Sequence, residues 1–390
     1  MAKLGEVCIQ ITDGSHNPPS GVEQSEYLML SSKNIDDDFI TLDSPRFLSH
    51  SDYIAENNRT TVCEGDLLMT IVGTIGRVAI VPKELNGICL QRSVAVIKPE
   101  REIVNNRYLM YQLQNMRPFL EKEARGVAQK GIYLKQVSQL DIKLPELEQQ
   151  KQIVKVLDKV TELISLRKQQ LTKLDKLVKA RFVEMFGNPS NNSLGFPYEP
   201  LSNCLLSIEN GKSFVCSNDM RQEENPAILK LSAVTYGVYQ QDENKAILDS
   251  SMFVKSAEVH KGDLLFTRKN TPELVGMCAY VNDTAPNLMM PDLIFRLNTN
   301  EKINKIFLWK LINHEFFRGK IQNIATGSAK SMSNISKERL EKLAIILPPL
   351  HLQNDFAALV ERVDQQKQTI QQSLEKLELL KKALMQEYFG

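Results

Sequence analysis

Apolar residues recur at alternating steps of four and three along two stretches of this chain, with four basic residues among them. In the first stretch the series is Ile153, Leu157, Val160, Ile164, Arg167, Leu171, Leu174, Val178, Arg181 and Met185. In the second stretch it is Phe356, Val360, Val363, Lys367, Ile370, Leu374, Leu377, Lys381, Leu384 and Tyr388. A heptad series of this length predicts long helices that pair as a coiled coil.

The two stretches are copies of each other. Residues 347–390 follow residues 144–187 without a gap, at an offset of 203. Leu-Pro opens both copies, and proline suits the first turn of a helix. Phe-Gly closes both copies, and glycine is a common helix stop. An internal repeat of this kind predicts a duplicated molecule, which is suited to a duplicated or two-part partner.

Antiparallel pairing within one chain is the arrangement that the connectivity favours. Each helix begins where a globular segment ends, so antiparallel helices would carry one globular segment at each end of a rod and bring Gly390 near Met1. About 40 helical residues span roughly 60 Å. In a symmetric register Arg167 would lie near Lys367, which is unfavourable. Outward-pointing stems, a shifted register or a partner at that face would each resolve this conflict, and the sequence does not choose among them.

The globular segments, residues 1–143 and 188–346, repeat more loosely. Gly65-Asp66-Leu67-Leu68 corresponds to Gly262-Asp263-Leu264-Leu265, and Gly14 to Gly211. Apolar, β-branched runs bounded by Gly, Asp and Pro predict strands, and the period turns helical near residues 105–114 and 305–314. The fold class is therefore α/β (α+β): two similar mixed domains separated by two long helices, residues 144–187 and 347–390, in a pseudo-twofold antiparallel coiled coil.

Length, composition and charge limit the classes of protein to which this chain can belong. A chain of 390 residues suggests two or more domains. The sequence has no apolar run of about 18 residues and no signal-peptide pattern, so we expect a cytoplasmic protein without a membrane segment. The six cysteines form no C-x-x-C pair and the five histidines no H-E-x-x-H motif, so a metal site is not expected. The net charge is +1, and neither globular segment has a bulk excess of Lys and Arg.

Three short motifs resemble functional ones. Residues 17–20, Asn-Pro-Pro-Ser, resemble the N-P-P-aromatic loop of amino-methyltransferases, but serine cannot stack on a flipped base and no F-x-G-x-G loop accompanies it. Gly211-Lys212-Ser213 lacks the first glycine of a P-loop. Gly73-Thr74-Ile75-Gly76 matches the GXXG loop of KH domains, yet lies between two strand-like runs rather than two helices. Turns and a strand connection are the better interpretations.

The sequence contains no recognisable set of catalytic residues. No Ser/His/Asp series, paired carboxylate or Cys/His set occurs in both halves or at their junction. In a doubled fold a catalytic set belongs in one of those places. We therefore predict a protein that is not itself an enzyme.

Basic and polar loop residues are the better candidates for function. Residues 125–133 and 326–334 occupy corresponding places, are interrupted by glycine and are rich in hydrogen-bond donors, which suits contact with phosphates and base edges. For any one of these residues, a solvated surface charge is an equally good interpretation. The candidates for DNA contact are His16, Arg77, Arg92, Arg125, Lys130, Tyr133, Lys212, Arg268, Lys269, Lys330 and Asn334.

Over essentially its whole length the chain resembles the specificity subunits of type I restriction–modification enzymes. The resemblance rests on Ile11-Thr12-Asp13-Gly14-Ser15-His16-x-x-Pro19, on the doubled Gly-Asp-Leu-Leu strand, and on Leu-Pro followed by a helix start that carries glutamine. It implies two target recognition domains, each reading half of a bipartite sequence in double-stranded DNA, with the paired helices as spacer. It also implies docking of methyltransferase subunits, two in number, and of restriction subunits in the full enzyme.

The resemblance assigns further roles. Leu147, Gln150, Leu350 and Gln353 at the helix starts are candidates for partner docking, although His351-Leu352 replaces Glu148-Gln149 in the second copy and makes the two starts unequal. S-adenosylmethionine, ATP and Mg are expected only in the partner subunits, so this chain needs no cofactor. Glu209-Asn210-Gly211-Lys212 replaces Thr12-Asp13-Gly14-Ser15, so the two domains are expected to read different half-sites.

The leading hypothesis is thus a non-catalytic, sequence-reading DNA-binding subunit. A coiled-coil scaffold whose α/β units bind protein rather than DNA is the first alternative, and the near-neutral charge favours it slightly. A DNA-modifying enzyme in its own right is the second alternative, and the absence of an F-x-G-x-G loop argues against it.

Overall fold

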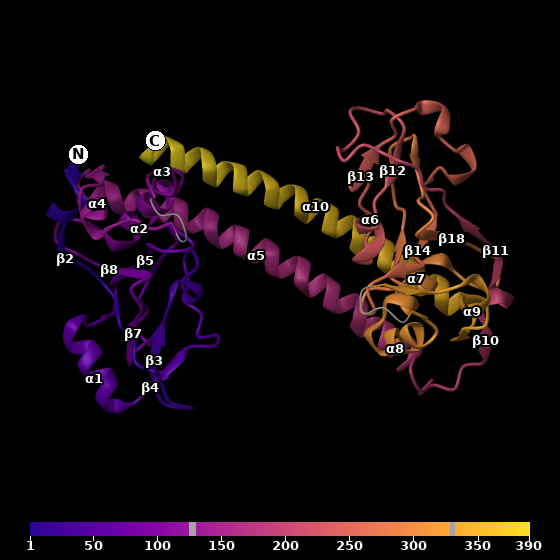
Figure 1. Ribbon diagram of the computed structural model, residues 1–390, viewed down its shortest axis with the longest axis horizontal. Coiled ribbons are helices and arrows are strands. Elements are labelled where there is room, and N and C mark those ends of the chain that lie inside the picture. Colours follow the sequence, from indigo (N-terminus) through magenta and orange to yellow (C-terminus); the bar gives the residue numbers. More distant parts are fainter. Residues whose placement is uncertain (125–129, 328–331) are drawn as a thin grey trace. The chain divides into compact units, whose positions relative to one another are not determined.

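The computed structural model describes residues 1–124, 130–327 and 332–390 (Figure 1). The chain forms two compact units. Unit 1 consists of Met1–Lys168 and Gln372–Gly390, and unit 2 of Gln169–Gln371. Each unit therefore contains one globular segment, the first half of the long helix that follows it in the sequence, and the last half of the other long helix.

Unit 1 is built on two sheets. The larger sheet is antiparallel, with the strand order β2 (Cys8–Asp13), β8 (Val94–Pro99), β5 (Leu67–Thr70), β6 (Val78–Ile80). The smaller sheet has the order β4 (Arg46–Leu48), β3 (Tyr27–Leu30), β7 (Ile88–Leu90), with β3 parallel to β7. A two-stranded ladder joins β1 (Ala2–Lys3) to β9 (Asp141–Ile142).

Unit 2 is built in the same way. Its larger sheet has the order β11 (Leu205–Asn210), β18 (Ile294–Thr299), β14 (Leu264–Thr267), β16 (Cys278–Tyr280). Its smaller sheet has the order β13 (Asn244–Ala246), β12 (Ala227–Leu229), β17 (Leu288–Met289). The two-stranded ladders are β10 (Tyr198–Pro200) with β20 (Ala344–Ile346), and β15 (Lys269–Asn270) with β19 (Ser333–Asn334).

The duplication predicted from the sequence is confirmed strand by strand. Each strand of the two larger sheets has a counterpart at the same place in the sheet order. The Gly-Asp-Leu-Leu segments lead into β5 and β14, the inner strands, whose four residues are all buried. The register also corresponds, because Leu68 pairs with Val96 in unit 1 and Leu265 with Arg296 in unit 2. The buried apolar runs Leu67–Thr70 and Leu264–Thr267 are therefore strands, as their sequence predicts.

Helices close each globular segment, as the change of period predicts. In unit 1, α1 (His50–Arg59) lies with the smaller sheet, and α2 (Asn106–Asn115), α3 (Arg117–Glu123) and α4 (Leu134–Ser138) with the larger one (Figure 1). In unit 2, α7 (Lys305–Asn313), α8 (Glu315–Asn323) and α9 (Lys337–Glu341) correspond to α2, α3 and α4, whereas the short α6 (Ser232–Thr235) follows β12 and contacts β14 and β16 of the larger sheet. Asn105 and Asn304 cap α2 and α7 by accepting hydrogen bonds from two backbone N–H groups each, as N-cap residues do.

Two helices of 40 residues form the repeated stretches, α5 (Leu147–Phe186) and α10 (Leu350–Phe389). Every residue of the two predicted heptad series is buried or half-buried. The pairing is antiparallel: in unit 2, Phe182 contacts Phe356 while Asp175 pairs with Lys367 eleven residues further along α10, and in unit 1 Lys168 pairs with Glu378 at 3.1 Å. The period of the apolar series thus predicts both the helices and the face by which they pair.

Three of the four basic residues of the series, Lys367, Arg181 and Lys381, have acidic or aromatic neighbours. Lys367 lies 2.7 Å from the Asp175 carboxylate, and Arg181 pairs with Glu184 on its own helix. Lys381 reaches Asp38 at 3.9 Å and lies over the Tyr111 ring. Because Lys367 faces Asp175, two turns beyond Arg167 along α5, its charge is compensated by this register rather than opposed by Arg167.

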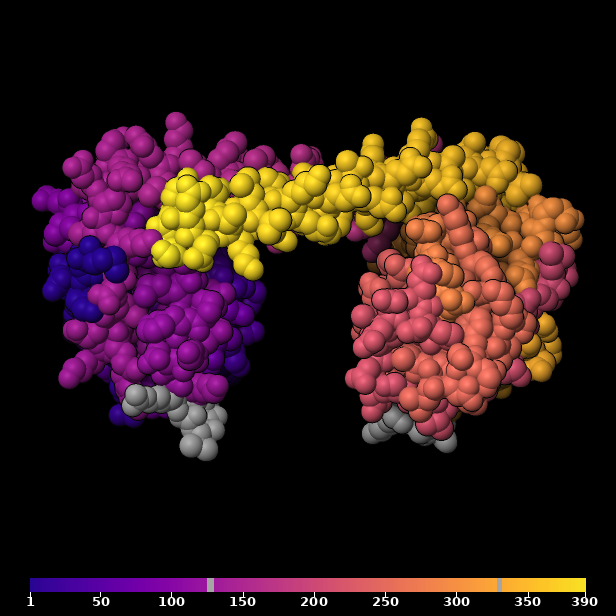
Figure 2. Space-filling model, turned by 90° about the horizontal axis from the view of Figure 1, so that it is seen from above, coloured from indigo at the N-terminus to yellow at the C-terminus, as the bar shows by residue number. Residues whose placement is uncertain are grey.

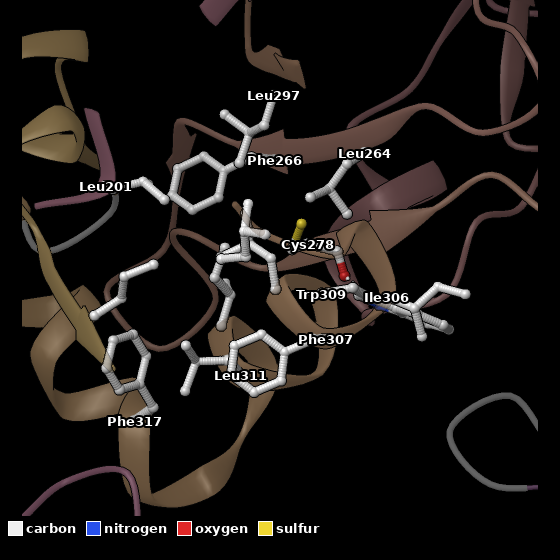
Figure 3. Close-up of a cluster of buried hydrophobic side chains, with 14 of the residues drawn as sticks. Leu201, Leu264, Phe266, Cys278, Leu297, Ile306, Phe307, Trp309, Leu311 and Phe317 are labelled. Carbon is white, nitrogen blue, oxygen red and sulfur yellow. Dashed lines mark hydrogen bonds between the residues drawn. The ribbon is translucent and has the colours of Figure 1, made fainter. Parts of the chain in front are cut away.

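The core of each unit incorporates the end of a long helix. In unit 2, Phe182 and Phe186 of α5 join Phe307 and Phe356, and the Phe186 and Phe307 ring centroids lie 4.8 Å apart. Figure 3 shows the neighbouring part of this core, where Phe266, Leu297 and Trp309 point toward the same apolar interior. In unit 1, Met385 and Phe389 of α10 join the corresponding core, and Figure 2 shows this yellow C-terminal end lying on the purple surface of unit 1.

Among the helices of the described residues, none has the length and apolar character needed to span a membrane.

Candidate functional site

The turn between β5 and β6 of unit 1 brings two of the predicted contact residues, Arg77 and Lys130, together. Gly73-Thr74-Ile75-Gly76 forms this turn, so it is the strand connection that the sequence favours. Gly73 and Gly76 both have positive φ, 83° and 79°, a conformation that a residue with a Cβ rarely adopts. The N–H of Gly73 donates to the carbonyl of Lys130, and that of Gly76 to the carbonyl of Thr70. The backbone of the turn is therefore fixed.

Three basic residues surround this turn. Arg77, Arg117 and Lys130 line a hollow of about 470 Å³ together with Glu121 and residues 73–75. Arg117 is a positioning residue: its Nε donates to the Gly76 carbonyl at 3.2 Å, and its Nη2 donates to Asp37. Arg77 makes only a loose pair with Asp36, at 3.7 Å. The predicted residues Arg77 and Lys130 thus lie on one surface.

Unit 2 has a corresponding turn with different chemistry. Arg318 donates to the Gly276 carbonyl at 2.9 Å, as Arg117 does to Gly76 in unit 1. The hollow beside this turn, about 340 Å³, is lined by residues 272–273, Gln322, residues 325–327 and Ser333. No cation lines it among the residues that the structure describes. The sequence did not single out Arg117 and Arg318, although the offset of 201 that relates them also relates Ala124 to Ala325.

The structure brings together three predicted residues of unit 2. Lys269 of β15 pairs with Asn334 of β19, and the Arg268 guanidinium donates to the Asn334 Oδ1 at 3.3 Å. The guanidinium carbon of Arg268 also lies 5.0 Å from the centre of the Phe295 ring. Arginine, lysine and asparagine side chains are the ones that read guanine and adenine edges in a major groove. This side of unit 2 therefore holds side chains of the kinds that can read bases, held together by contacts within the unit.

The corresponding glycines Gly14 and Gly211 have a structural role. A Cβ on Gly14 would lie 2.1 Å from the Leu90 carbonyl oxygen, and one on Gly211 2.1 Å from that of Pro291. Backbone segments approach too closely here for any side chain. Gly211-Lys212-Ser213 consequently lies where two backbone segments approach closely, in a stretch without a regular turn, and the Asp292 N–H donates to Ser213 Oγ at 3.0 Å.

His16, Arg92 and Lys212 follow these close approaches. The His16 ring lies 2.7 Å from Asp13, which Arg59 also approaches at 3.4 Å. The backbone N–H of Arg92 donates to the Ser15 carbonyl, so Arg92 lies beside the segment that carries His16. Lys212, anchored through its backbone to Met290, is exposed at the corresponding place in unit 2.

The remaining three predicted residues belong to none of these groups: one lies elsewhere on unit 1, and two fall outside the residues that the structure describes. Tyr133 is 69% exposed and precedes α4, where its N–H donates to Gln136. Arg125 and Lys330 fall outside the described residues.

The prediction that Gln150 and Gln353 dock a partner is corrected by the structure. Both side chains are 0% exposed. The Gln150 carbonyl accepts from the N–H of Asn105 while its amide donates to Ile103 and Pro145. Gln353 repeats this set with Asn304, Lys302 and Pro348. A buried amide with all these groups engaged ties the helix start to its globular segment and offers nothing to a partner.

The two leucines at the helix starts remain predictions. Leu350 is 43% exposed and Leu147 is half-buried, so both have surface to offer.

A charged cluster joins α7 to the long helices in unit 2. The Lys310 ammonium lies 3.4 Å from the centre of the Trp309 ring, and burial lowers the pKa of Lys310 to about 8 although Asp364 counteracts it. Burial also raises the pKa of Asp364, against the effect of Lys310 and Lys367. In unit 1 the corresponding place on α2 holds Tyr111, which donates to Asp158 at 2.7 Å. These groups anchor helices to one another, and Asp158 also lines a hollow of about 680 Å³ in unit 1 together with Arg107 and residues of α5.

Two cysteine thiols, those of the half-buried Cys8 and the buried Cys89, are poorly suited to nucleophilic or metal chemistry. Burial raises the pKa of Cys8 and of Cys89 to about 12, so both stay protonated at neutral pH. In the ranges 1–124, 130–327 and 332–390, no group of three or more His, Cys, Asp or Glu side chains is placed to hold a metal ion.

Comparisons with known proteins agree on one family. Residues 29–176 and 205–379 match the family described as type I restriction modification DNA specificity domain. The specificity subunit of the type I restriction enzyme EcoEI from Escherichia coli is 27% identical over 218 residues, 53% of this chain and 37% of that protein. The MjaVIII specificity subunit of Methanocaldococcus jannaschii is 23% identical over 352 residues, 84% of this chain and 79% of that protein.

The fold agrees as well. The crystal structure of the S subunit of a type I restriction–modification system from M. genitalium superimposes with a TM-score of 0.62 at 12% identity, covering 100% of this chain and 95% of that one. The match to EcoEI spans little more than a third of that relative's length.

Proposed function

Because this chain belongs to the type I restriction–modification DNA specificity family, we propose that it is the sequence-reading subunit of a type I complex. The observation that supports this best is the duplication: two units share one strand order but carry different polar residues around the same turn. A repeated frame with unlike loops suits a bipartite target whose halves differ. Each unit reads one half-site in double-stranded DNA.

The two units offer different readout. Arg268 and Asn334 of unit 2 are held against each other, and arginine and asparagine are the usual partners of guanine and adenine. In unit 1 the corresponding turn carries Arg77 and Lys130 instead. The half-sites are therefore different, and exchanging residues 1–143 for those of a related subunit should change only one of them.

The long helices set the distance between the half-sites. Helices α5 and α10 each contribute to both units, so both must be lengthened to keep their pairing. One added turn in each adds about 5.4 Å, between one and two base-pair steps. Methylome sequencing of such a variant should show unchanged half-sites and a longer spacer, and an unchanged spacer would refute this role.

The partners are methyltransferase subunits, two per chain, and restriction subunits in the full complex. The chain itself is non-catalytic and binds no cofactor, with S-adenosylmethionine, ATP and Mg in the partners. The net charge of +1 supports a division of labour in which partner subunits supply much of the non-specific attraction to DNA, since that term depends on neutralising phosphates.

Binding measurements test this function directly. The chain is co-expressed with a methyltransferase subunit, its modified sequence is determined by methylome sequencing, and binding to DNA with and without that sequence is compared. Sequence-selective binding by the complex is the expected result. A chain that binds its partner but gives no selective retention would favour the alternative, a coiled-coil scaffold whose units bind protein. Cofactor binding to the isolated chain would instead favour a DNA-modifying enzyme.

A further inference from the structure

The hollow beside residues 73–76 in unit 1 has an excess of positive charge. Arg77, Arg117 and Lys130 line it with one acidic residue, Glu121. Arg117 is engaged with the Gly76 carbonyl and Asp37. Lys130 has no ion-pair partner among the described residues, and the single partner of Arg77 is 3.7 Å away. Two cations are thus available to a ligand, whereas the charge of Arg117 is compensated by Asp37.

The turn itself adds hydrogen-bond donors. Within the described part of the chain, neither the backbone N–H nor the hydroxyl of Thr74 has a hydrogen-bond partner, and Thr74 is exposed. The nearest atom to a Cβ built on Gly73 would be Ser32 Oγ at 3.8 Å, so the space beside this backbone is open. Turns with residues in the left-handed conformation present their N–H groups to anions, and lysine and arginine complete such sites.

The corresponding hollow of unit 2 lacks each of these features. Residues 270–273 are Asn-Thr-Pro-Glu. Thr271 already donates its N–H to the Asn270 side chain at 2.9 Å, and Pro272 has no N–H. Glu273, an acidic residue, lines that hollow, and no cation lines it among the described residues. An anion would be repelled there, so the feature belongs to unit 1 and is not a general consequence of the repeated fold.

We propose that the hollow formed by Thr74, Arg77 and Lys130 binds one phosphate of the DNA backbone. This inference rests on the proposed function, because it supplies a contact for the DNA that unit 1 reads. A phosphate carries no sequence information, so this contact would position unit 1 on the duplex while other residues read the bases. Unit 2 would have to obtain its phosphate contacts elsewhere on its surface.

The test uses the full chain bound to its methyltransferase partner, with Lys130→Gln and Arg77→Gln as separate variants. Lys83→Gln is the matched control, because Lys83 is an exposed cation of the same unit that follows the other end of β6. Affinity for the target duplex is measured across a range of salt concentrations. Each hollow variant should reduce the slope of log K against log salt by about one and weaken binding to target and non-target DNA by the same factor. The control should leave the slope unchanged.

The outcomes separate this inference from the function on which it rests. If the wild-type complex shows no sequence-selective binding, the proposed function fails. If it binds selectively but Lys130→Gln and Arg77→Gln behave like Lys83→Gln, the phosphate site alone is refuted. If either variant changes the methylated sequence, the hollow reads a base and the phosphate assignment is wrong. A duplex carrying single neutral methylphosphonates supplies a second measurement: one position should weaken wild-type binding and have little further effect on Lys130→Gln.

Discussion

The ring of Phe389 lies against the ring of Tyr108, with their centroids 5.2 Å apart and their planes inclined at 61°. Phe389 is the residue before the C-terminal Gly390, whereas Tyr108 belongs to α2 of the first globular segment. The counterpart of Phe389 in the repeat, Phe186, packs on Phe307 of α7 in unit 2. Each unit therefore completes its core with an aromatic residue from the end of a long helix.

Truncating these two residues should destabilise different units. Phe389→Ala should lower the stability of unit 1, and Phe186→Ala that of unit 2, each by about 3–5 kcal/mol, the usual cost of emptying a buried phenylalanine site. The one tryptophan, Trp309, is 5% exposed and lies in unit 2, so its fluorescence reports that unit. Denaturation followed by this signal should respond to Phe186→Ala alone.

The control for this pair is Leu379→Ala. Leu379 is 69% exposed on α10, so its removal should change neither transition by more than about 0.5 kcal/mol. A large shift of the tryptophan signal in Phe389→Ala would mean that the units unfold together and would contradict their separate stabilities.

Replacing Gln353 by methionine should show that the buried amide ties α10 to unit 2. The substitution keeps the volume but leaves the Asn304 N–H and the carbonyls of Lys302 and Pro348 without their partner. Each buried group left without a hydrogen-bond partner lowers the free energy of unfolding by up to about 1–3 kcal/mol. Hydrogen exchange at the Asn304 amide should accelerate. Gln365→Met, an exposed change on the same helix, serves as control, and equal exchange in both variants would refute the role.

Adding one methyl group should have opposite effects at two glycines of unit 2. In Gly211→Ala the new Cβ would lie 2.1 Å from the Pro291 carbonyl oxygen, so strands must separate and we expect a loss of about 3 kcal/mol or more. In Gly319→Ala, within α8, the new Cβ meets nothing within 4 Å, and helix propensity predicts a gain of up to about 1 kcal/mol. Urea denaturation followed by Trp309 fluorescence measures both, and similar effects would contradict the close approach at Gly211.

Mild acid should destabilise unit 2 through His314. Burial lowers the pKa of His314, whose ring centroid lies 4.8 Å from that of Phe182, and Lys179 acts in the same direction against Glu315. The unfolded chain therefore takes up the proton first as the pH falls below about 6.5, so stability present above that pH is lost below it. His314→Asn keeps a side chain that can cap α8 and removes the titration.

Comparison of the two proteins isolates this histidine from other titrating groups, including Asp364. The unfolding free energy of each protein is measured by Trp309 fluorescence. Between pH 7.5 and 5.5 the wild type should lose stability relative to His314→Asn. A difference that does not change with pH would mean that His314 binds protons equally in the folded and unfolded states, and would contradict the lowered pKa.

The sequence predicted the duplication, the strand character of the inner strands and the helical pairing face. These features leave a local record, because burial on one face imposes a period on the chain. The repeat also showed which loops of the two halves are equivalent. The loops near residues 73–77 and 268–276 were therefore recognised as candidate contact regions from the sequence alone. Arg117 and Arg318 were missed, since a positioning arginine on a helix looks like any other surface charge.

The sequence by itself determined which segments are equivalent, which fold as helix or strand, and which family the chain resembles. Only the tertiary structure decided what individual polar side chains do. Gln150 and Gln353 lie at helix starts, where a surface role and a buried one have the same sequence pattern, and long-range hydrogen bonds to residues about 50 positions away place them inside. Likewise Lys130 and Arg77 are 53 residues apart, and their shared hollow exists because the β5–β6 turn and the chain after α3 meet in space.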